Sequence, residues 1–412
     1  MDFLGERYYK LNRILLVCVG LWPYDTSPLK KIQIIFFEAL FLSILLCQLN
    51  VFLVENCDIA KIMKILMFFL INCIVIIEYN SGLLLTNTIK YIFTRVHYDW
   101  TILKNQAELD IIQKYACNAR FHTIAFMLLG TFMCAGLFIL SSIPFILNAI
   151  IPLNESRPLW LPIIVEYFVD QERYFFAILT HIFMTTFAGC ITLAGIATMH
   201  IAYALHNCAI FEIVSYRMEH IFEENILQMS KDIREHILHE RLIHVVYLHR
   251  RAIDLTNILT NGFATLYVIL LLFGIASTSF SVFHFFNVLT SLNNVLEVIE
   301  TSTLILIHLY YLYVGNYVGQ SIIDTSTNIF RTTYNTKWYA APLWLQKVIL
   351  FIMQRSSIRS TLTAASLFDA SLEGFATLMS MSMSYVMFML STRSQQENMQ
   401  KNYNYDLVEF DL

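Results

Sequence analysis

The side chains most capable of chemistry in this sequence are ionisable groups that lie within long apolar stretches. Such a group costs a few kcal/mol in a lipid bilayer unless it is paired or hydrated, so each one needs an explanation. His181 and His308 could each hydrogen-bond a ligand in an apolar pocket, and the alternative for each is a histidine satisfied by packing contacts. The acidic members of this set are Glu38, Glu78, Glu297 and Glu300.

These four acidic groups have two interpretations. Glu38 and Glu78 lie toward the ends of their stretches that adjoin cationic segments, which favours contacts with Lys or Arg. Glu297 and Glu300 begin an apolar stretch, which favours side chains that reach the membrane interface. The functional alternative is a hydrated vestibule between the stretches that carry His181 and His308.

Enzyme motifs are missing from the sequence. No phosphate-binding GxxxxGK[ST] or GxGxxG run and no GxSxG elbow occurs. The run HERLIH at 239–244 has one residue too many to place two histidines on one zinc ion. Five of the 12 histidines lie between His220 and His249, and a solvated helical surface explains them better than a metal site. We therefore predict no enzyme activity, no cofactor and no metal, and a net charge of −4 gives no reason to expect nucleic acid as a partner.

The elements that must position these groups follow from the composition. Hydrophobic residues make up 57% of the 412 residues, charged residues make up 14%, and the mean hydropathy is +0.58. A soluble domain carries about 25% charged residues. A membrane-spanning helix needs about 20 mostly apolar residues. The sequence therefore predicts an all-α membrane protein, with spans near 32–54, 62–85, 124–151, 175–204, 258–283 and 295–318 and a shorter seventh span near 375–390.

The orientation of these spans is predicted by the Lys and Arg residues of the loops. Segments 1–31, 86–123, 205–257 and 319–361 hold 21 of the 27 cationic residues, and the opposite loops hold five. Because cationic loops resist translocation, the N-terminus is predicted to be cytoplasmic and the C-terminus extracellular. The one N-x-[ST] sequon places a candidate glycosylation site at Asn154, in a predicted outer loop.

The loops and spans together predict a layout. Residues 1–31 form a cytoplasmic segment with an interfacial helix at 14–22, and residues 32–318 hold six spans with long helical extensions at 205–257. A cytoplasmic anchor follows at 319–361, with a short helix at 343–353, and then the seventh span at 362–393 and a polar, disordered extracellular tail at 394–412. Gly315 and Gly319 are four residues apart, a spacing that permits close helix approach.

The seventh span differs from the other six because Ser and Thr alternate with Met, Phe and Leu. This pattern fits a helix that lines a pore with an apolar constriction, and it fits a buried packing helix equally well.

Short strings are spread over nearly the whole length of the chain. They are LNR at 11–13, GLWP at 20–23, EYFVDQERYF at 166–175, HNC at 206–208, SYRMEH at 215–220, HRR at 249–251, WY at 338–339, LTA at 362–364, SLE at 371–373 and SY at 384–385. In their order and spacing these strings resemble the insect odorant receptor family, of the kind expanded in ants, bees and wasps. The chain departs from the family at Ala365, where Gly is frequent, and in the 19 residues after Arg393.

The resemblance implies an odorant-binding subunit of a ligand-gated, non-selective cation channel in the plasma membrane of olfactory neuron dendrites. A shared co-receptor would complete a heterotetramer, and the ligand would be a small volatile or hydrocarbon. The implied pocket lies between spans two, three, four and six, at Phe68, Asn72, Phe138, Ser142, Ile178, His181, Ile182, Thr301, Leu304 and His308. The implied pore constriction lies near Phe388, Ser391 and Thr392, counted from Tyr385. A gustatory-type receptor of the same superfamily and a secondary transporter are the alternatives.

Overall fold

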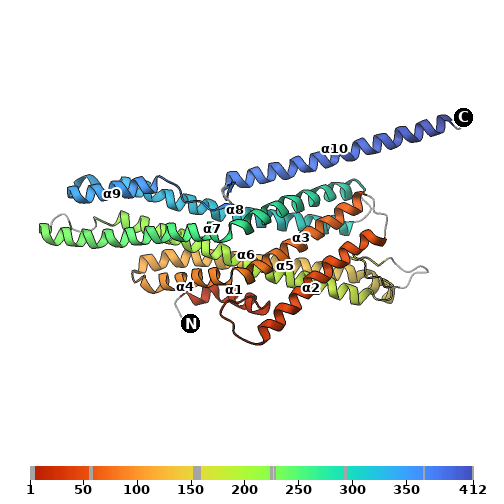
Figure 1. Cartoon of the computed structure of the whole chain (residues 1–412), viewed down its shortest axis with the longest axis horizontal. Helices are drawn as coiled ribbons and strands as arrows, with labels where there is room; N and C mark the ends of the chain where they lie inside the picture. Colours follow the sequence, from red (N-terminus) through yellow and green to blue (C-terminus); the bar gives the residue numbers. More distant parts are fainter. Residues whose placement is uncertain are drawn as a thin grey trace.

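The computed structural model describes residues 5–54, 59–151, 159–222, 226, 229–291, 295–364 and 367–410. This part of the chain is helical apart from one two-stranded ribbon, and the long helices run roughly side by side (Figure 1). The elements are α1 (Glu6–Cys18), α2 (Leu29–Val54), α3 (Ile59–Leu84), α4 (Thr86–Ile102), α5 (Gln106–Ile150), α6 (Phe175–Glu219), α7 (Lys231–Ser291), α8 (Val295–Asn335), η2 (Trp338–Ala340), α9 (Leu343–Ser356), β1 (Thr363–Ala364), β2 (Phe368–Asp369) and α10 (Leu372–Phe410).

Seven of the helices in the described part of the chain are long and apolar enough to cross a membrane. They are α2, α3, α5, α6, α7, α8 and α10, and they cover the seven spans predicted from the sequence except for the last residue of the second and third spans. The prediction of an all-α, seven-helix membrane protein is therefore confirmed.

The start of the seventh span was predicted wrongly. Residues 363–369 form the antiparallel ribbon β1–β2, in which Thr363 is opposite Asp369, and α10 begins only at Leu372. Two-residue strands are too short to show the alternating pattern that identifies a strand in a sequence. Helix α10 continues through Phe410, into the segment expected to be the tail.

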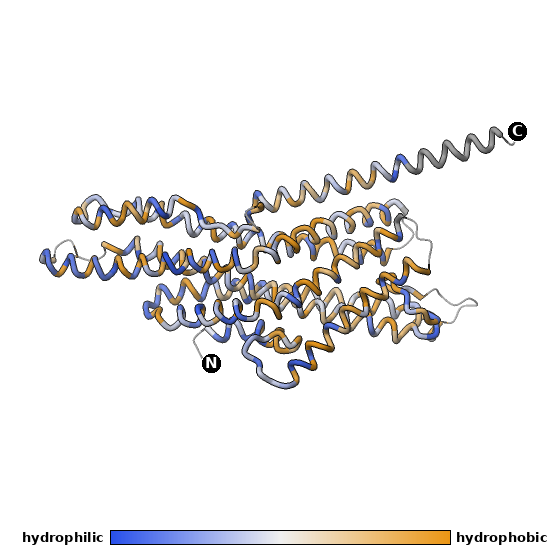
Figure 2. Tube along the Cα trace, in the orientation of Figure 1, coloured by the Kyte–Doolittle hydropathy of each residue, from blue (hydrophilic) through white to orange (hydrophobic). Residues whose placement is uncertain are grey.

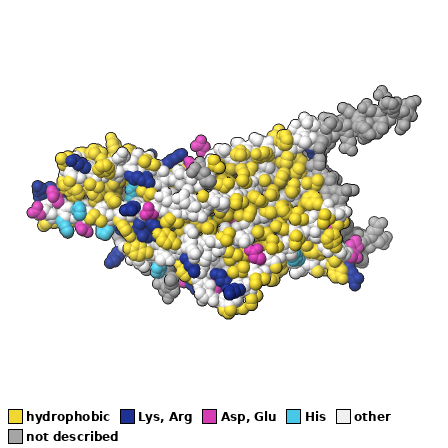
Figure 3. Space-filling view, viewed as in Figure 1, with side chains coloured by type: hydrophobic (Ala, Val, Ile, Leu, Met, Phe, Trp, Pro, Cys, Tyr) yellow, Lys and Arg dark blue, Asp and Glu magenta, His cyan; other side chains and the backbone are white. Residues whose placement is uncertain are grey.

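The two ends of the molecule differ in polarity. α6 runs to Glu219, α7 begins at Lys231 and α8 runs to Asn335, so these helices continue far beyond their apolar parts. Figure 2 shows hydrophilic residues concentrated at this end and hydrophobic residues over the rest of the bundle. On the face drawn in Figure 3, Lys and Arg side chains cluster over the left half and hydrophobic side chains cover most of the right half.

A buried ionic network joins α4, α6 and α7 at the polar end. Asp99 is 2% exposed, its Oδ1 lies 2.5 Å from Arg251 Nη2, and its Oδ2 lies 3.1 Å from His206 Nε2. Beside it, Asn207 Nδ2 donates a hydrogen bond of 2.7 Å to Thr256 Oγ1. These contacts join the HNC and HRR strings in the folded chain, and a buried charge such as that of Asp99 is tolerated only when its partner is in place.

The N-terminal helix α1 packs against the bundle. Asn12 is 1% exposed, donates to Thr198 Oγ1 of α6 at 2.7 Å and accepts from Thr123 Oγ1 of α5 at 3.3 Å. Gly20 follows α1 with a φ of +74°, a conformation that favours glycine, and it turns the chain so that Trp22 packs edge-on against Phe93 of α4. The LNR and GLWP strings thus position this helix.

Candidate ligand cavities and pore helix

An apolar cavity of about 140 Å³ lies between α3, α5, α6 and α8, and we call it the α5 cavity. Apolar and aromatic side chains form most of its wall, with glycines on α5 and α6 where neighbouring helices approach closely. The residues used below that line it are Phe68, Asn72, Phe126, Gly130, Met133, Thr185, Gly189, Cys190, Leu304, Ile307, His308 and Tyr311.

The polar groups of the α5 cavity already have partners. His308 Nδ1 lies 2.8 Å from the Leu304 carbonyl oxygen, so Nδ1 carries the proton and Nε2 accepts from Ser277 Oγ at 2.9 Å. Asn72 Nδ2 donates to Gln48 Oε1 at 3.1 Å, and Thr185 Oγ1 donates to a backbone carbonyl oxygen. A ligand in this cavity therefore meets mainly apolar surface.

Four of the ten pocket residues expected from the sequence line the α5 cavity, namely Phe68, Asn72, Leu304 and His308. Phe138 and Ile182 line a separate hollow of about 10 Å³ between α5 and α6. The other residues do not line the α5 cavity: Ile178 and Thr301 are buried beside it in the packing, and Ser142 donates to the Phe138 carbonyl oxygen of its own helix. Sequence reasoning missed Met133, Gly130 and Gly189. The only signal at the two glycines is a small residue among bulky ones, and Met133 carries no signal at all.

His181 has a structural role away from the α5 cavity. The Ser43 hydroxyl donates to the Leu40 carbonyl oxygen at 2.8 Å, so Ser43 Oγ accepts from His181 Nε2 at 2.9 Å. His181 Nδ1 then accepts from the Tyr167 hydroxyl at 2.6 Å. The imidazole thereby ties α6 to α2 and to the segment that precedes α6.

The acidic groups in the spans have partners other than those expected. Glu78 is 1% exposed, and its Oε1 accepts from the Tyr311 hydroxyl at 3.1 Å, while no Lys or Arg of the described chain pairs with it. Glu300 is 4% exposed rather than reaching the interface, and its two carboxyl oxygens are buried without a hydrogen bond to a described residue. Glu297 forms an ion pair with Lys64 of α3 and lies 3.5 Å from His284 Nε2 of α7.

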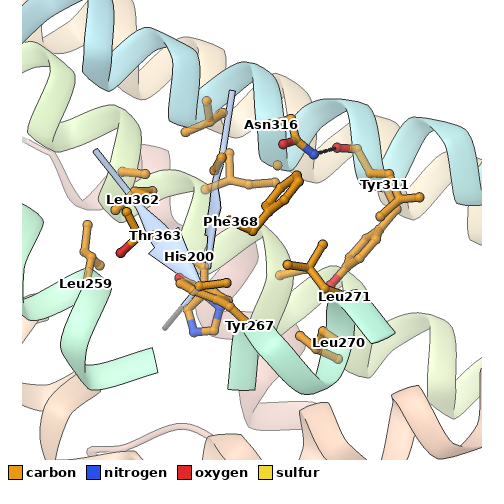
Figure 4. A pocket seen from close by; sticks show the side chains of 18 of the residues that line it. His200, Leu259, Tyr267, Leu270, Leu271, Tyr311, Asn316, Leu362, Thr363 and Phe368 are labelled. Carbon is orange, nitrogen blue, oxygen red and sulfur yellow. Dashed lines mark hydrogen bonds between the residues drawn. The ribbon is translucent and has the colours of Figure 1, made fainter. Parts of the chain in front are cut away.

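A second cavity, of about 160 Å³, lies between α6, α7, α8 and the β1–β2 ribbon, and we call it the hairpin cavity (Figure 4). Its wall includes Glu78 of α3, His200 of α6, Tyr267 of α7 and Phe368 of β2. Tyr311 lines both cavities. The sequence did not reveal this site. The β1–β2 ribbon that closes the cavity lies next to α7 and α8 only in the folded chain, so no local sequence pattern marks the cavity.

Gly315 and Gly319 of α8 have different surroundings at the hairpin cavity. A Cβ atom at Gly319 would lie 2.3 Å from the Ala370 carbonyl oxygen, so the segment after the ribbon approaches the helix backbone closely there. A Cβ at Gly315 would meet no atom within 4 Å, since Gly315 faces the cavity. The expected close approach thus occurs at one glycine of the pair.

Helix α10 is packed along one face and uncovered along the other. Leu378 and Val386 are buried, and Leu378 packs with Ile275 of α7 and Leu312 of α8. Phe388 is 68% exposed, and Met387 and Tyr385 are more than half exposed. Ser391 and Thr392 are exposed on the same helix. In Figure 1, α10 extends away from the rest of the bundle toward its C-terminal end.

Two other expectations concern modification and metals. Asn154 lies outside the described residues. Among the described residues, no group of three His, Cys, Asp or Glu side chains is placed to hold a metal ion. Of the histidines between His220 and His249, His236, His239 and His244 are exposed. His249 is buried, and burial together with Arg355 lowers its pKa to about 4.

Comparison with known proteins supports the family that the strings suggested. The chain is 26% identical to odorant receptor 22c of Drosophila melanogaster over 246 residues, or 58% of each chain. It is 26% identical to odorant receptor 10a of the same species over 220 residues, or 52% of each chain. The matched segments thus span little more than half the length of these relatives.

Solved structures share the fold over nearly the whole chain. The olfactory receptor OR5 from Machilis hrabei superposes with a TM-score of 0.76, at 13% identity, over 94% of this chain and 98% of that one. OR5 in complex with eugenol gives a TM-score of 0.73 at 12% identity, over 94% and 97%. The fold is that of a multi-pass membrane protein. The model of the seven-transmembrane odorant receptors matches residues 87–383, and the chain therefore belongs to this odorant receptor family.

Proposed function

We propose that this chain is the odorant-binding subunit of a ligand-gated, non-selective cation channel, and that the odorant occupies the α5 cavity. The observation that carries the proposal is the cavity itself, which is apolar, lies among four membrane helices and has its polar groups paired internally. Such a wall suits a small volatile or hydrocarbon ligand, because binding there removes apolar surface from water without leaving polar groups unpaired. OR5 from Machilis hrabei, which shares the fold, forms a complex with eugenol.

The pore would be lined by the uncovered face of α10. Phe388 extends from this face and Ser391 and Thr392 follow it, so apolar and hydroxyl groups alternate as in a gated constriction. A single chain leaves this face without a partner, which supports assembly with further subunits. We propose a heterotetramer with a shared co-receptor, with α10 from each subunit around one axis.

The orientation of the chain in the bilayer follows from its charges. The polar end formed by α6, α7 and α9 would lie in the cytoplasm, because 21 of the 27 Lys and Arg residues belong to the segments on that side. The same orientation places the N-terminus in the cytoplasm and the end of α10 outside. The site of action would be the plasma membrane of olfactory neuron dendrites.

The test is to express the chain with and without the co-receptor and to record currents during exposure to volatiles and cuticular hydrocarbons. We expect a ligand-evoked cation current only with the co-receptor. No current across a broad panel would contradict the channel proposal, and a current from the chain alone would contradict the requirement for a co-receptor.

The binding site is tested by filling the α5 cavity. Met133 lines it, and Met133→Trp should weaken odorant potency by roughly a hundredfold, because about 3 kcal/mol of binding is lost when a tryptophan occupies the space. The matched control is Leu128→Trp, on the same helix at a position that is 52% exposed. Equal potency in the two variants at equal surface expression would exclude the α5 cavity as the odorant site.

A further inference from the structure

The hairpin cavity contains hydrogen-bonding groups that the fold leaves unused. Glu78 Oε1 accepts from Tyr311, but Glu78 Oε2 is buried and has no hydrogen-bond partner in the described part of the chain. The Tyr267 hydroxyl and both ring nitrogens of His200 also make no hydrogen bond to a described residue, although the two rings contact each other edge to face at 6.2 Å. Three helices thus bring unsatisfied groups to one cavity.

The three groups are neighbours. Tyr311 donates to Glu78 Oε1 at 3.1 Å, and both residues line the hairpin cavity. The rings of His200 and Tyr267, which contact each other, line the same cavity. In Figure 4, the Tyr311 ring points into the cavity toward Leu271, and His200 and Tyr267 lie close together across from it. Buried polar groups in native proteins are nearly always hydrogen-bonded, to protein, water or a ligand, so the buried Glu78 Oε2 needs a partner, and the half-buried His200 and Tyr267 side chains beside it have groups left to bond to the same occupant.

We propose that the hairpin cavity is a second ligand site, for a small molecule with an apolar body and one hydroxyl group. A hydroxyl group both donates and accepts, so it can bond to the Glu78 carboxyl group and the Tyr267 hydroxyl together. The remaining wall is apolar and includes Leu259, Leu270 and Phe368. The volume of about 160 Å³ suits one ring, since a dry cavity of about 150 Å³ in another protein holds benzene.

The position of the hairpin cavity allows a bound molecule to influence α10. The β1–β2 ribbon forms one wall, through Thr363, Ala364 and Phe368, and α10 begins three residues after β2 ends. A bound molecule therefore contacts the segment that holds the proposed pore helix. It alters gating to the extent that it binds the open and closed arrangements of this ribbon with different affinities. Binding itself does not depend on the proposed channel function.

The test measures binding of 4-fluorophenol to the purified full-length chain in lipid nanodiscs, by equilibrium dialysis with ¹⁹F detection and empty nanodiscs subtracted. Gly315→Leu places an isobutyl group at the wall of the hairpin cavity, where a Cβ meets no atom within 4 Å. Gly136→Leu is the matched control, since Gly136 has equally open surroundings on α5 and lines neither cavity. We expect the Gly315→Leu chain to bind one molecule of 4-fluorophenol fewer than wild type, because its hairpin cavity is filled. The Gly136→Leu and Met133→Trp chains should keep the molecule bound in the hairpin cavity.

Equal binding of 4-fluorophenol by Gly315→Leu and Gly136→Leu would overturn the proposal. A wild-type chain that binds a single molecule of 4-fluorophenol, and loses it in Met133→Trp, would also overturn it. Tyr267→Phe provides a test that does not require filling the cavity. This variant should weaken 4-fluorophenol binding at the hairpin site about fivefold, the effect of one lost hydrogen bond, and leave 4-fluorotoluene binding unchanged. Equal affinity of wild type and Tyr267→Phe for 4-fluorophenol would mean that the Tyr267 hydroxyl does not bond to the ligand, and it would overturn the proposed recognition of a hydroxyl group.

Discussion

The α5 cavity and the hairpin cavity have similar volumes, about 140 and 160 Å³, and share the Tyr311 side chain. In the α5 cavity, His308 and Asn72 are bonded to Ser277 and Gln48, so the wall presents apolar surface. In the hairpin cavity, Glu78 Oε2 and the Tyr267 hydroxyl have no partner among the described residues. Volume is therefore a poor guide to what a cavity in this bundle binds, and the state of its polar groups is a better one.

The two cavities also differ in their walls, because only the hairpin cavity is closed by the β1–β2 ribbon. The largest expected effect on stability and current comes from a change beside this ribbon. Gly319→Ala places a methyl group where the Ala370 carbonyl oxygen lies 2.3 Å away, so the segment between β2 and α10 must move. We expect a loss of roughly 1–3 kcal/mol in stability and a large loss of ligand-evoked current. Binding of 4-fluorotoluene in the α5 cavity should persist.

Gly274→Ala is the control for this change, since a Cβ there meets Leu312 Cδ2 at an ordinary 3.6 Å. Thermal unfolding in detergent and whole-cell currents measure the two effects. Wild-type currents from Gly319→Ala would show that the ribbon does not hold the pore helix.

The second prediction concerns the residue that the two cavities share. Tyr311→Phe removes the donor to Glu78 Oε1 and leaves both oxygens of a buried carboxyl group without partners. We expect a loss of about 1–3 kcal/mol in stability. Tyr313→Phe on the same helix is the control, because Tyr313 is 44% exposed and its hydroxyl bonds to no described residue. Equal melting temperatures for the two variants would mean that the Glu78–Tyr311 bond contributes nothing.

A third change should give the α5 cavity an unpaired polar group, as the hairpin cavity has, and so change its ligand preference. Ser277→Ala leaves His308 Nε2 without its partner, at a cost of about 1 kcal/mol. In a Gly315→Leu background, where the α5 cavity alone remains open, this variant should shift preference from 4-fluorotoluene toward 4-fluorophenol. An unchanged preference would show that internal pairing does not set ligand selectivity here.

The smallest expected effect is that of Tyr267→Phe on stability. Because the Tyr267 hydroxyl makes no bond to a described residue, its removal should change the free energy of unfolding by less than about 0.5 kcal/mol. A thermal melt of the ligand-free chain measures this. A loss as large as that of Tyr311→Phe would mean that the hydroxyl is already satisfied, and the contrast between the cavities would disappear.

The sequence predicted the seven spans well because the length of an apolar run is a local property. It predicted the α5 cavity in part. Phe68 and Leu304 line the cavity, whereas Phe138 on α5 is 37% exposed and lines the separate small hollow toward α6. A helix that is apolar on every face carries no periodic signal that fixes its rotation, so choosing among Met133, Phe138 and Ser142 required the packed structure.

The hairpin cavity was not predictable for a different reason. The donor to Glu78 is Tyr311, 233 residues away along the chain, and β1 and β2 have two residues each. A carboxyl group in an apolar span does indicate a special site, but the sequence suggested a cationic partner rather than a phenol. Which groups would remain unpaired is a property of the assembled bundle.

The Tyr311 ring belongs to the walls of both cavities, so the binding affinities of the two cavities can be linked. If an occupant of the hairpin cavity changes the affinity of the α5 cavity for an odorant by some factor, the odorant must change the affinity of the hairpin cavity by the same factor. This reciprocity holds whether or not the pore opens. The interaction between the two sites can therefore be measured from either ligand in a chain that carries no current at all.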